Sequence, residues 1–349
     1  MEQTLTNEVL YKPYTCVWEL TLKCNMHCKH CGSSAGKARE NELTLDECLD
    51  VATQIVEIGV KHVSFIGGEV FLYNEWEKIA RKLVIGDVYT NIITNGYVMG
   101  DEQIEQIIYA GVGNVALSID GMAQQHNNMR NVNDAFEKIT KTIDTLNEAD
   151  IEIAVITSLL NSNVNELENL YNFILDNNVK IWQLQTVTPM GNMANKKEQL
   201  IEPLKMASIT KFIREKHAEQ KIEIVASDNI GYFDENEPYI RSLHGTNCEW
   251  RGCSAGLCVF GIDSVGNVKG CESLYSDEFI EGNLRKESLS EIWNKEGNFA
   301  YNRNFDVSML TGNCKDCDKG IICKGGCRSS GYFATGSKYE NPFCQYNIK

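Results

Sequence analysis

Short apolar runs and longer amphipathic segments alternate along the first two hundred residues of the chain. The apolar runs, rich in β-branched and aromatic residues, predict strands at 16–22, 60–66, 88–94, 113–119, 151–158 and 180–187. The segments between them carry apolar residues every three or four positions and predict a helix that begins at Thr44 and helices at 75–84, 101–110, 133–147 and 163–177. Alternating strands and helices build a parallel sheet covered by helices. We therefore predict an α/β fold, a partial (β/α)6 barrel similar to an incomplete TIM barrel.

Polar motifs follow the predicted strands at the edge of the sheet where the active sites of such barrels lie. They are Gly67-Gly68-Glu69 after the second strand, Thr94-Asn95-Gly96 after the third, Ser118-Ile119-Asp120 after the fourth, with His126 and Arg130 beyond it, Thr157-Ser158 after the fifth and Gln185 at the end of the sixth. Each motif alone is common in turns, and a lone histidine such as His126 is more often structural than a ligand. Their shared position makes them candidate site residues.

Cys24, Cys28 and Cys31 follow the first predicted strand at the spacing C-x3-C-x2-C. Cysteine thiolates bind iron–sulfur clusters. Three ligands on one loop can bind three irons of a [4Fe–4S] cluster and leave the fourth iron open, as a catalytic metal site requires. A zinc loop or a redox disulfide is the alternative, but zinc sites usually combine pairs of C-x2-C units.

Length, charge and cysteine content narrow the class of protein. The 349 residues, 43% of them hydrophobic, suffice for a core domain and a smaller appendage. A net charge of -15 argues against a nucleic-acid partner, because phosphate binding needs a basic face. Neither a signal peptide nor an apolar run long enough to span a membrane is present, so we expect a cytoplasmic protein without a membrane partner. Fourteen cysteines in a reducing compartment indicate metal binding rather than disulfides.

The three-cysteine loop and the motifs after it resemble the radical S-adenosylmethionine (radical SAM) enzymes. In that family the open iron binds S-adenosylmethionine, and an electron from the cluster releases a 5′-deoxyadenosyl radical that takes a hydrogen atom from the substrate. The resemblance implies cofactor contacts from His30 (adenine), Gly67, Gly68 and Glu69 (methionyl ammonium), Asn95 (cofactor cleft), Ser118 and Arg130 (carboxylate), Asp120 (ribose) and Gln185. The chain departs from the family pattern where Val70 replaces a proline and Asn131 replaces a glycine.

A second group of cysteines occupies the C-terminal hundred residues. Its spacing, C-x12-G-x4-C followed by C-x2-C-x5-C-x3-C and a last cysteine, resembles the SPASM domain found on one branch of radical SAM enzymes. By this resemblance one auxiliary [4Fe–4S] cluster is bound by Cys253, Cys258, Cys271 and Cys327, and another by Cys314, Cys317, Cys323 and Cys344. A zinc ribbon remains the alternative, and Cys248 could replace Cys253. Glu272, next to Cys271, is a candidate catalytic residue because sulfatase-maturing relatives carry a proton-accepting aspartate there.

These assignments predict a radical SAM barrel at 1–200, a bridging segment at 201–250 and a small cysteine-rich SPASM domain at 251–349. The resemblance implies three [4Fe–4S] clusters, S-adenosylmethionine and a flavodoxin- or ferredoxin-type electron donor.

Most enzymes of this architecture modify peptides, so we expect a ribosomally made peptide substrate and an oxidative cross-link: a thioether, C–C or C–O bond. Only 23 residues precede Cys24, so leader recognition is expected to need a separate leader-binding protein, or else the barrel and the bridging segment themselves. The alternatives are a formylglycine-forming sulfatase maturase, a peptide epimerase and a small-molecule dehydrogenase. A non-catalytic electron carrier is a different class, which would not need the S-adenosylmethionine motifs.

Overall fold

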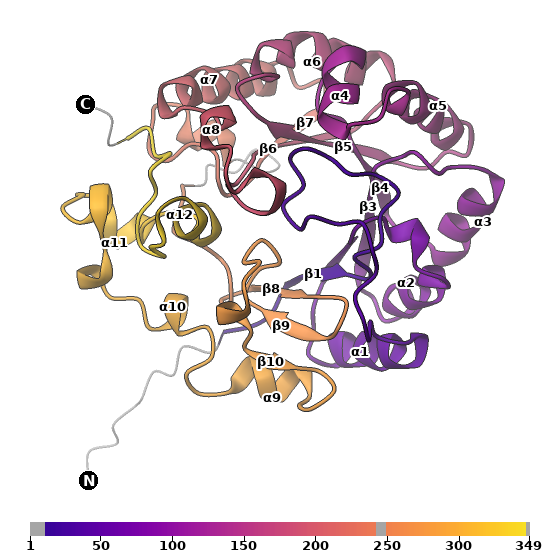
Figure 1. Ribbon diagram of the computed structural model, residues 1–349, viewed down its shortest axis with the longest axis horizontal. Helices are drawn as coiled ribbons and strands as arrows, with labels where there is room; N and C mark the ends of the chain where they lie inside the picture. The colour runs from indigo at the N-terminus through magenta and orange to yellow at the C-terminus, as the bar shows by residue number, and fades with distance from the viewer. Residues whose placement is uncertain (1–10, 242–248, 347–349) are drawn as a thin grey trace.

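One ten-stranded sheet organises the computed structural model, which describes residues 11–241 and 249–346 (Figure 1). Its strand order is β10-β9-β8-β1-β2-β3-β4-β5-β6-β7. The six predicted strands are present, parallel and adjacent in chain order: β1 (Thr15–Glu19), β2 (His62–Ile66), β3 (Tyr89–Thr94), β4 (Asn114–Ser118), β5 (Ile153–Leu159) and β6 (Ile181–Thr186). This arrangement confirms the α/β barrel, and the pairing shows two further parallel strands at its sides.

Helices form an outer layer around the curved sheet, as Figure 1 shows for the first half of the chain. They are α1 (Leu45–Glu57), α2 (Trp76–Ile85), α3 (Asp101–Ala110), α4 (Ala123–Arg130), α5 (Ala135–Glu148), α6 (Leu167–Asp176) and α7 (Pro203–Glu219). The start of α1 follows from its sequence, because Thr44 and Glu47 form a reciprocal capping box. No helix in the described ranges is long and apolar enough to cross a membrane.

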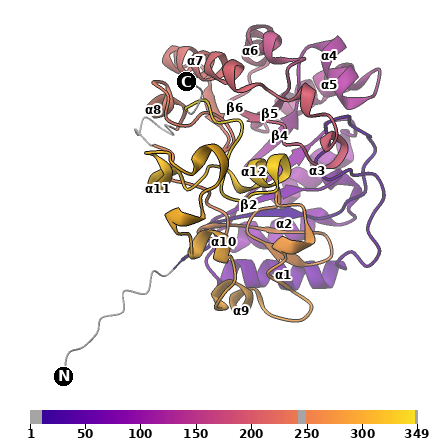
Figure 2. The ribbon, with the colours of Figure 1, turned by 60° about the vertical axis from the view of Figure 1, so that its left-hand side comes forward.

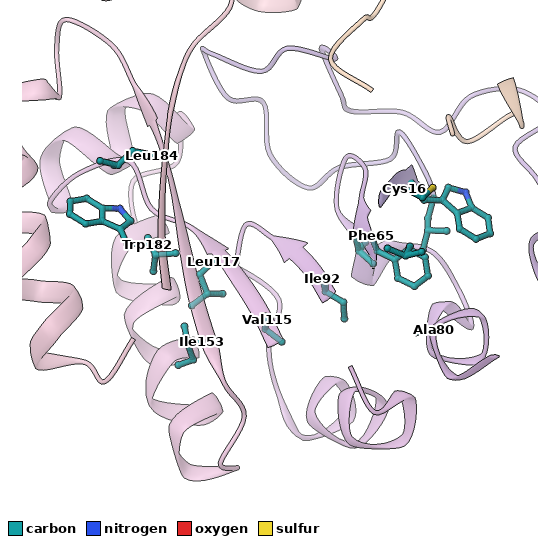
Figure 3. Close-up of a cluster of buried hydrophobic side chains, with 14 of the residues drawn as sticks. Cys16, Phe65, Ala80, Ile92, Val115, Leu117, Ile153, Trp182 and Leu184 are labelled. Atoms are coloured by element: carbon teal, nitrogen blue, oxygen red, sulfur yellow. The ribbon is translucent and has the colours of Figure 1, made fainter. Parts of the chain in front are cut away.

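Alternate residues of each barrel strand face opposite sides of the sheet. The outer side chains pack under the helices and form the main core, where Phe65, Ile92, Leu117 and Trp182 come from neighbouring strands (Figure 3). Burying a side chain of this size stabilises the fold by roughly 1.5–3 kcal/mol. The inner side chains are not part of this core, and several of them line a cavity.

The C-terminal residues extend the same sheet instead of forming a sheet of their own. β8 (Val259–Ile262) pairs in parallel with β1, with Trp18 opposite Ile262, and continues into the antiparallel strands β9 (Asn267–Lys269) and β10 (Gly282–Asn283). The predicted hairpin at Gly266-Asn267 is confirmed, and Gly266 has the positive φ of 85° that such a turn favours. The helices that follow are α9 (Leu289–Asn294), α10 (Ala300–Arg303), α11 (Gly320–Cys323) and α12 (Arg328–Thr335), which gather on one side of the barrel (Figure 2).

Three elements differ from the sequence prediction. α4 was not expected, because its sequence AQQHNNMR lacks an apolar repeat, and it places His126 in a helix and not in a loop. β7 (Glu223–Ala226) and α8 (Glu237–Ile240) lie within the predicted bridging segment, and β7 pairs in parallel with β6. The barrel sheet therefore continues past residue 200, while the domain boundaries at 200 and 250 stay predictions. Cys248 lies outside the described residues.

Candidate cofactor and substrate cavity

A cavity of about 450 Å³ opens at the carboxyl ends of the barrel strands. Its wall takes inward-facing residues from all six predicted strands, among them Val17, Ile66, Ile93, Ser118, Ser158 and Gln185. The cavity is also lined by Cys24, Cys28 and Cys31 of one loop and by Cys271, Glu272 and Tyr275 of the C-terminal region. Its volume is within the range of pockets that bind small molecules and cofactors.

The three cysteines of the first motif all line this cavity. Asn192, after β6, holds their loop: its backbone N–H donates to the Cys31 carbonyl at 2.9 Å and its Nδ2 donates to the Cys28 carbonyl at 2.8 Å. Burial, together with smaller contributions from Glu69, Cys28 and Cys31, raises the pKa of the Cys24 thiol to about 11. Three thiols that lie within electrostatic reach of one another fit an iron–sulfur cluster, since its positive irons stabilise the thiolates.

Hydrogen-bond donors approach each of these sulfurs. The backbone N–H of Met26 lies 3.4 Å from the Cys24 sulfur, and that of Ala35 lies 3.3 Å from the Cys31 sulfur. Arg130 Nη1 lies 3.9 Å from the Cys28 sulfur. Such contacts tune the reduction potential of a bound cluster.

Gly67 and Gly68 line the cavity because the backbone of the cysteine loop lies directly against them. A Cβ atom at Gly67 would lie 2.4 Å from the Thr21 carbonyl oxygen, and one at Gly68 would lie 2.2 Å from the Lys23 carbonyl oxygen. Only glycine allows so close a backbone approach. Their exposed backbone is therefore available to a ligand, as predicted.

Glu69 has a different position from the one expected. Its carboxylate is 1% exposed and accepts hydrogen bonds from the Thr94 hydroxyl at 2.8 Å and from the Asn95 backbone N–H at 2.9 Å. It is not among the lining residues, whereas Asn95 is. The expectation of a direct ammonium contact is corrected: the carboxylate lies behind the wall and holds Asn95 in it.

The roles of His30, Ser118, Arg130 and Gln185 as cofactor contacts stay predictions, but all four residues line the cavity. Asp120 does not, because its side chain is fully buried behind them. Its carboxylate contacts Arg130 Nη2 at 2.7 Å and His30 Nε2 at 3.3 Å. Although burial opposes ionisation, Arg130 and His30 hold the pKa of Asp120 well below its usual range. The expected ribose contact is therefore corrected to an internal ion pair that orients Arg130.

Around Glu272 the cavity is bounded by a buried polar network, of which the sequence analysis singled out only Glu272 itself. Glu272, 5% exposed, pairs with Lys269 Nζ at 2.8 Å, and burial raises its pKa to about 8 against the effect of Lys269. Next to it, Arg39 pairs with Glu19 of β1 and also contacts Tyr275. Glu19 could have been found from the sequence, because it is a carboxylate at an inward-facing position of a predicted strand.

The structure brings together the C-terminal cysteines in the two predicted sets. A small second cavity is lined by Cys314, Cys317, Cys323 and Cys344. In the other set, burial raises the pKa of Cys258, Cys271 and Cys327, and the nearby Cys253 adds to each shift. Within the described ranges, no three His, Cys, Asp or Glu side chains converge as ligands of a single metal ion do. The assignment of the two cysteine sets to two four-iron clusters remains our prediction.

Comparisons with known proteins agree with this site. Residues 18–174 match the Radical SAM superfamily, and residues 253–318 match SPASM, an iron–sulfur cluster-binding domain. The chain is 29% identical over 345 residues to the AdoMet-dependent heme synthase of Methanosarcina barkeri (strain Fusaro / DSM 804), covering 96% of this chain and 97% of that protein. It is 24% identical to the mycofactocin maturase MftC of Mycolicibacterium smegmatis, over 95% of this chain and 81% of that one. Among solved structures, Streptococcus suis SuiB bound to S-adenosylmethionine has the same fold, with a TM-score of 0.77 at 16% identity over 96% of this chain and 78% of SuiB.

Proposed function

Because this chain is a radical SAM enzyme with a C-terminal SPASM domain, we propose that it removes a hydrogen atom from a ribosomally made peptide and installs an oxidative cross-link. The new bond would be a thioether, a C–C or a C–O bond. When bound, S-adenosylmethionine and the [4Fe–4S] clusters supply the hydrogen-abstracting radical and an outlet for the electron released. The residues described above bind, orient and enclose these groups.

The cavity that two cysteine sets share is the observation that carries this proposal. Cys24, Cys28 and Cys31 line it, and so does Cys271 of the first auxiliary set. A substrate bound in this cavity would lie near both the proposed site of hydrogen abstraction and a proposed electron acceptor. This arrangement favours reactions that remove electrons from the substrate. Glu272 also lines the cavity, and we propose that its carboxylate contacts that substrate.

The charge of the cavity favours a peptide over a polyanionic substrate. Two carboxylates, Glu19 and Glu272, line it, while Arg130 is the single lysine or arginine among its described lining residues. Arg39 and Lys269, which lie behind these carboxylates, are already paired with them. A neutral or basic peptide needs no further cation, and it would also be attracted to a protein of net charge -15.

A heme-type reaction is the second candidate function. It is favoured by the similarity to the heme synthase of Methanosarcina barkeri, which extends over nearly the full length of both chains. Heme macrocycles carry propionate carboxylates, and these require cationic partners in a buried site. Arg130, the single lysine or arginine among the described lining residues, is already paired with Asp120, which argues against such a substrate.

Two partners belong to the proposal. A flavodoxin- or ferredoxin-type protein would donate the electrons, and a separate protein would present the leader segment of the peptide. The acidic surface favours a basic peptide segment, because opposite charge accelerates encounter.

The test is an anaerobic incubation of reduced enzyme with S-adenosylmethionine and a peptide encoded beside its gene, in heavy water, followed by mass spectrometry. A peptide lighter by two hydrogens would support an oxidative cross-link, and fragmentation would locate the bond. Incorporation of one solvent deuterium would instead indicate epimerisation. A peptide that stays unchanged while 5′-deoxyadenosine forms would refute the peptide proposal.

A parallel incubation with a propionate-bearing iron porphyrin tests the heme-type candidate. A mass change in the porphyrin alone would establish that function in place of the peptide reaction. The variant in which Cys24, Cys28 and Cys31 are all alanine is the control for both incubations. Its products should equal those of a mixture without S-adenosylmethionine.

A further inference from the structure

Arg130 places a buried positive charge beside one of the three cluster-binding cysteines. It is the last residue of α4 and is 8% exposed. Nη1 of its guanidinium lies 3.9 Å from the Cys28 sulfur, and Nη2 lies 2.7 Å from the Asp120 carboxylate. The guanidinium therefore bridges a proposed iron ligand and a fully buried acid.

Asp120 is itself fixed from several sides, so the guanidinium has little freedom. The Ser158 backbone N–H donates to Asp120 Oδ1 at 3.0 Å, and His30 Nε2 lies 3.3 Å from Oδ2. The Asp120 backbone N–H donates to His126 Nδ1 at 3.2 Å. His126, also fully buried, thus supports the start of the loop that carries Asp120.

The other two cysteine sulfurs have neutral donors. Their nearest described donors are the backbone N–H groups of Met26 and Ala35. Among these three nearest donors, Arg130 is therefore the one that carries a charge. The other two are neutral backbone N–H groups. A full positive charge in a buried site acts on a nearby redox centre more strongly than a backbone dipole does.

We propose that Arg130 sets the reduction potential of the cluster bound by Cys24, Cys28 and Cys31, and that Asp120 holds the guanidinium in place while offsetting part of its charge. Reduction adds an electron to the cluster, and an N–H···S hydrogen bond from a cation stabilises that added charge. Arg130 therefore raises the potential, and the Asp120 carboxylate lowers it. This inference rests on the ligand assignment of the proposed function but not on the identity of the substrate.

Two variants test the proposal because they move the potential in opposite directions. We expect Arg130→Gln, which removes the positive charge, to make the potential of this cluster more negative. Asp120→Asn removes the opposing negative charge and keeps the shape of the side chain, so it should make the potential less negative. Arg130→Lys keeps the charge at a shorter reach and should fall between Arg130→Gln and the wild type.

The measurement is a redox titration of the purified holoenzyme, monitored by electron paramagnetic resonance without S-adenosylmethionine. The relevant cluster is the one whose signal changes when S-adenosylmethionine is then added. Arg285→Gln is the matched control, because Arg285 also forms an ion pair, with Glu47, but lies at the surface and has no described contact with Cys24, Cys28 or Cys31. Its potential should equal that of the wild type.

Equal potentials in Arg130→Gln and the wild type, or shifts of the same sign in Arg130→Gln and Asp120→Asn, would overturn the proposal. If the Arg130→Gln variant fails to retain iron, the Asp120→Asn variant alone tests the proposal. A potential in Asp120→Asn that is unchanged or more negative than that of the wild type would then refute the proposal. A purely structural role predicts loss of iron without these opposite shifts. Absence of any peptide product would contradict the proposed function but leave the potentials unaffected, so the two failures are distinguishable.

Discussion

Replacing Gly68 with alanine should displace the loop that carries Cys24, Cys28 and Cys31, the proposed cluster ligands. The added Cβ would lie 2.2 Å from the Lys23 carbonyl oxygen, where ordinary contacts begin at 3.4 Å. The backbone next to Cys24 would therefore have to move by about 1.2 Å. Neither partner can yield by a rotamer change, because the atoms that collide with the new methyl group belong to the backbone of Leu22 and Lys23.

A misplacement of about 1 Å at a reacting centre typically lowers the rate roughly 10²-fold. That corresponds to about 2.7 kcal/mol in the activation free energy. We expect Gly68→Ala to form 5′-deoxyadenosine roughly 10²-fold more slowly than the wild type at saturating S-adenosylmethionine. The auxiliary cysteine sets do not contact Gly68, so most of the iron should remain bound.

The assay measures 5′-deoxyadenosine by chromatography after chemical reduction, together with iron content and the melting temperature. Gly100→Ala is the matched control: a Cβ there would meet only the Gln103 side chain, at 3.7 Å, and its φ of -160° is extended backbone. Its rate should stay close to that of the wild type. A wild-type rate in Gly68→Ala would refute the reasoning that this close contact positions the cysteine loop.

Three further predictions follow from the site and the core. Replacing Cys24, Cys28 and Cys31 together by alanine should abolish 5′-deoxyadenosine formation and leave roughly two clusters' worth of iron; retained cleavage would contradict the ligand assignment. Glu272→Gln, which keeps a hydrogen-bond acceptor for Lys269, should retain S-adenosylmethionine cleavage but lose the peptide product. The control variant, Glu278→Gln at the surface, should keep both activities. Equal amounts of peptide product in the two variants would exclude a role for Glu272. Burial raises the pKa of Cys48 to about 11, so its thiol, 1% exposed, should resist iodoacetamide at pH 8 until urea unfolds the protein. The same shift means that the contribution of Cys48 to stability is present below pH 9, the ordinary thiol pKa, and is lost as the pH rises towards 11; mass spectrometry of labelled peptides would show early modification if the prediction is wrong.

Local sequence patterns were sufficient for the elements that depend on local interactions. The six barrel strands and the helix after Thr44 were predicted because alternation and helical periodicity reflect which side of each element is buried. The hairpin at Gly266 was predicted because its turn needs a positive φ. The three cysteines Cys24, Cys28 and Cys31 could also be recognised as proposed ligands from the sequence. They lie on one short loop, so their proximity does not depend on contacts between distant segments.

Elements whose formation depends on packing were not predictable in this way. α4 has almost no apolar repeat, and β7 has only four residues, so neither carries a periodic signal. Both depend on neighbouring elements: His126 of α4 packs against Phe136 of α5, and β7 continues the hydrogen bonds of β6.

The roles of the polar site residues were decided only by the tertiary structure. Glu69 and Asp120 stand in motifs that suggest direct contact with a ligand, yet packing buries both carboxylates behind the cavity wall. Tyr275 approaches Glu19 within 3.5 Å across 256 positions of sequence, because β8 pairs with β1. A motif specifies which groups are available at a strand end. Which of them face the cavity depends on contacts between distant segments, and those contacts arise only when the chain buries its core.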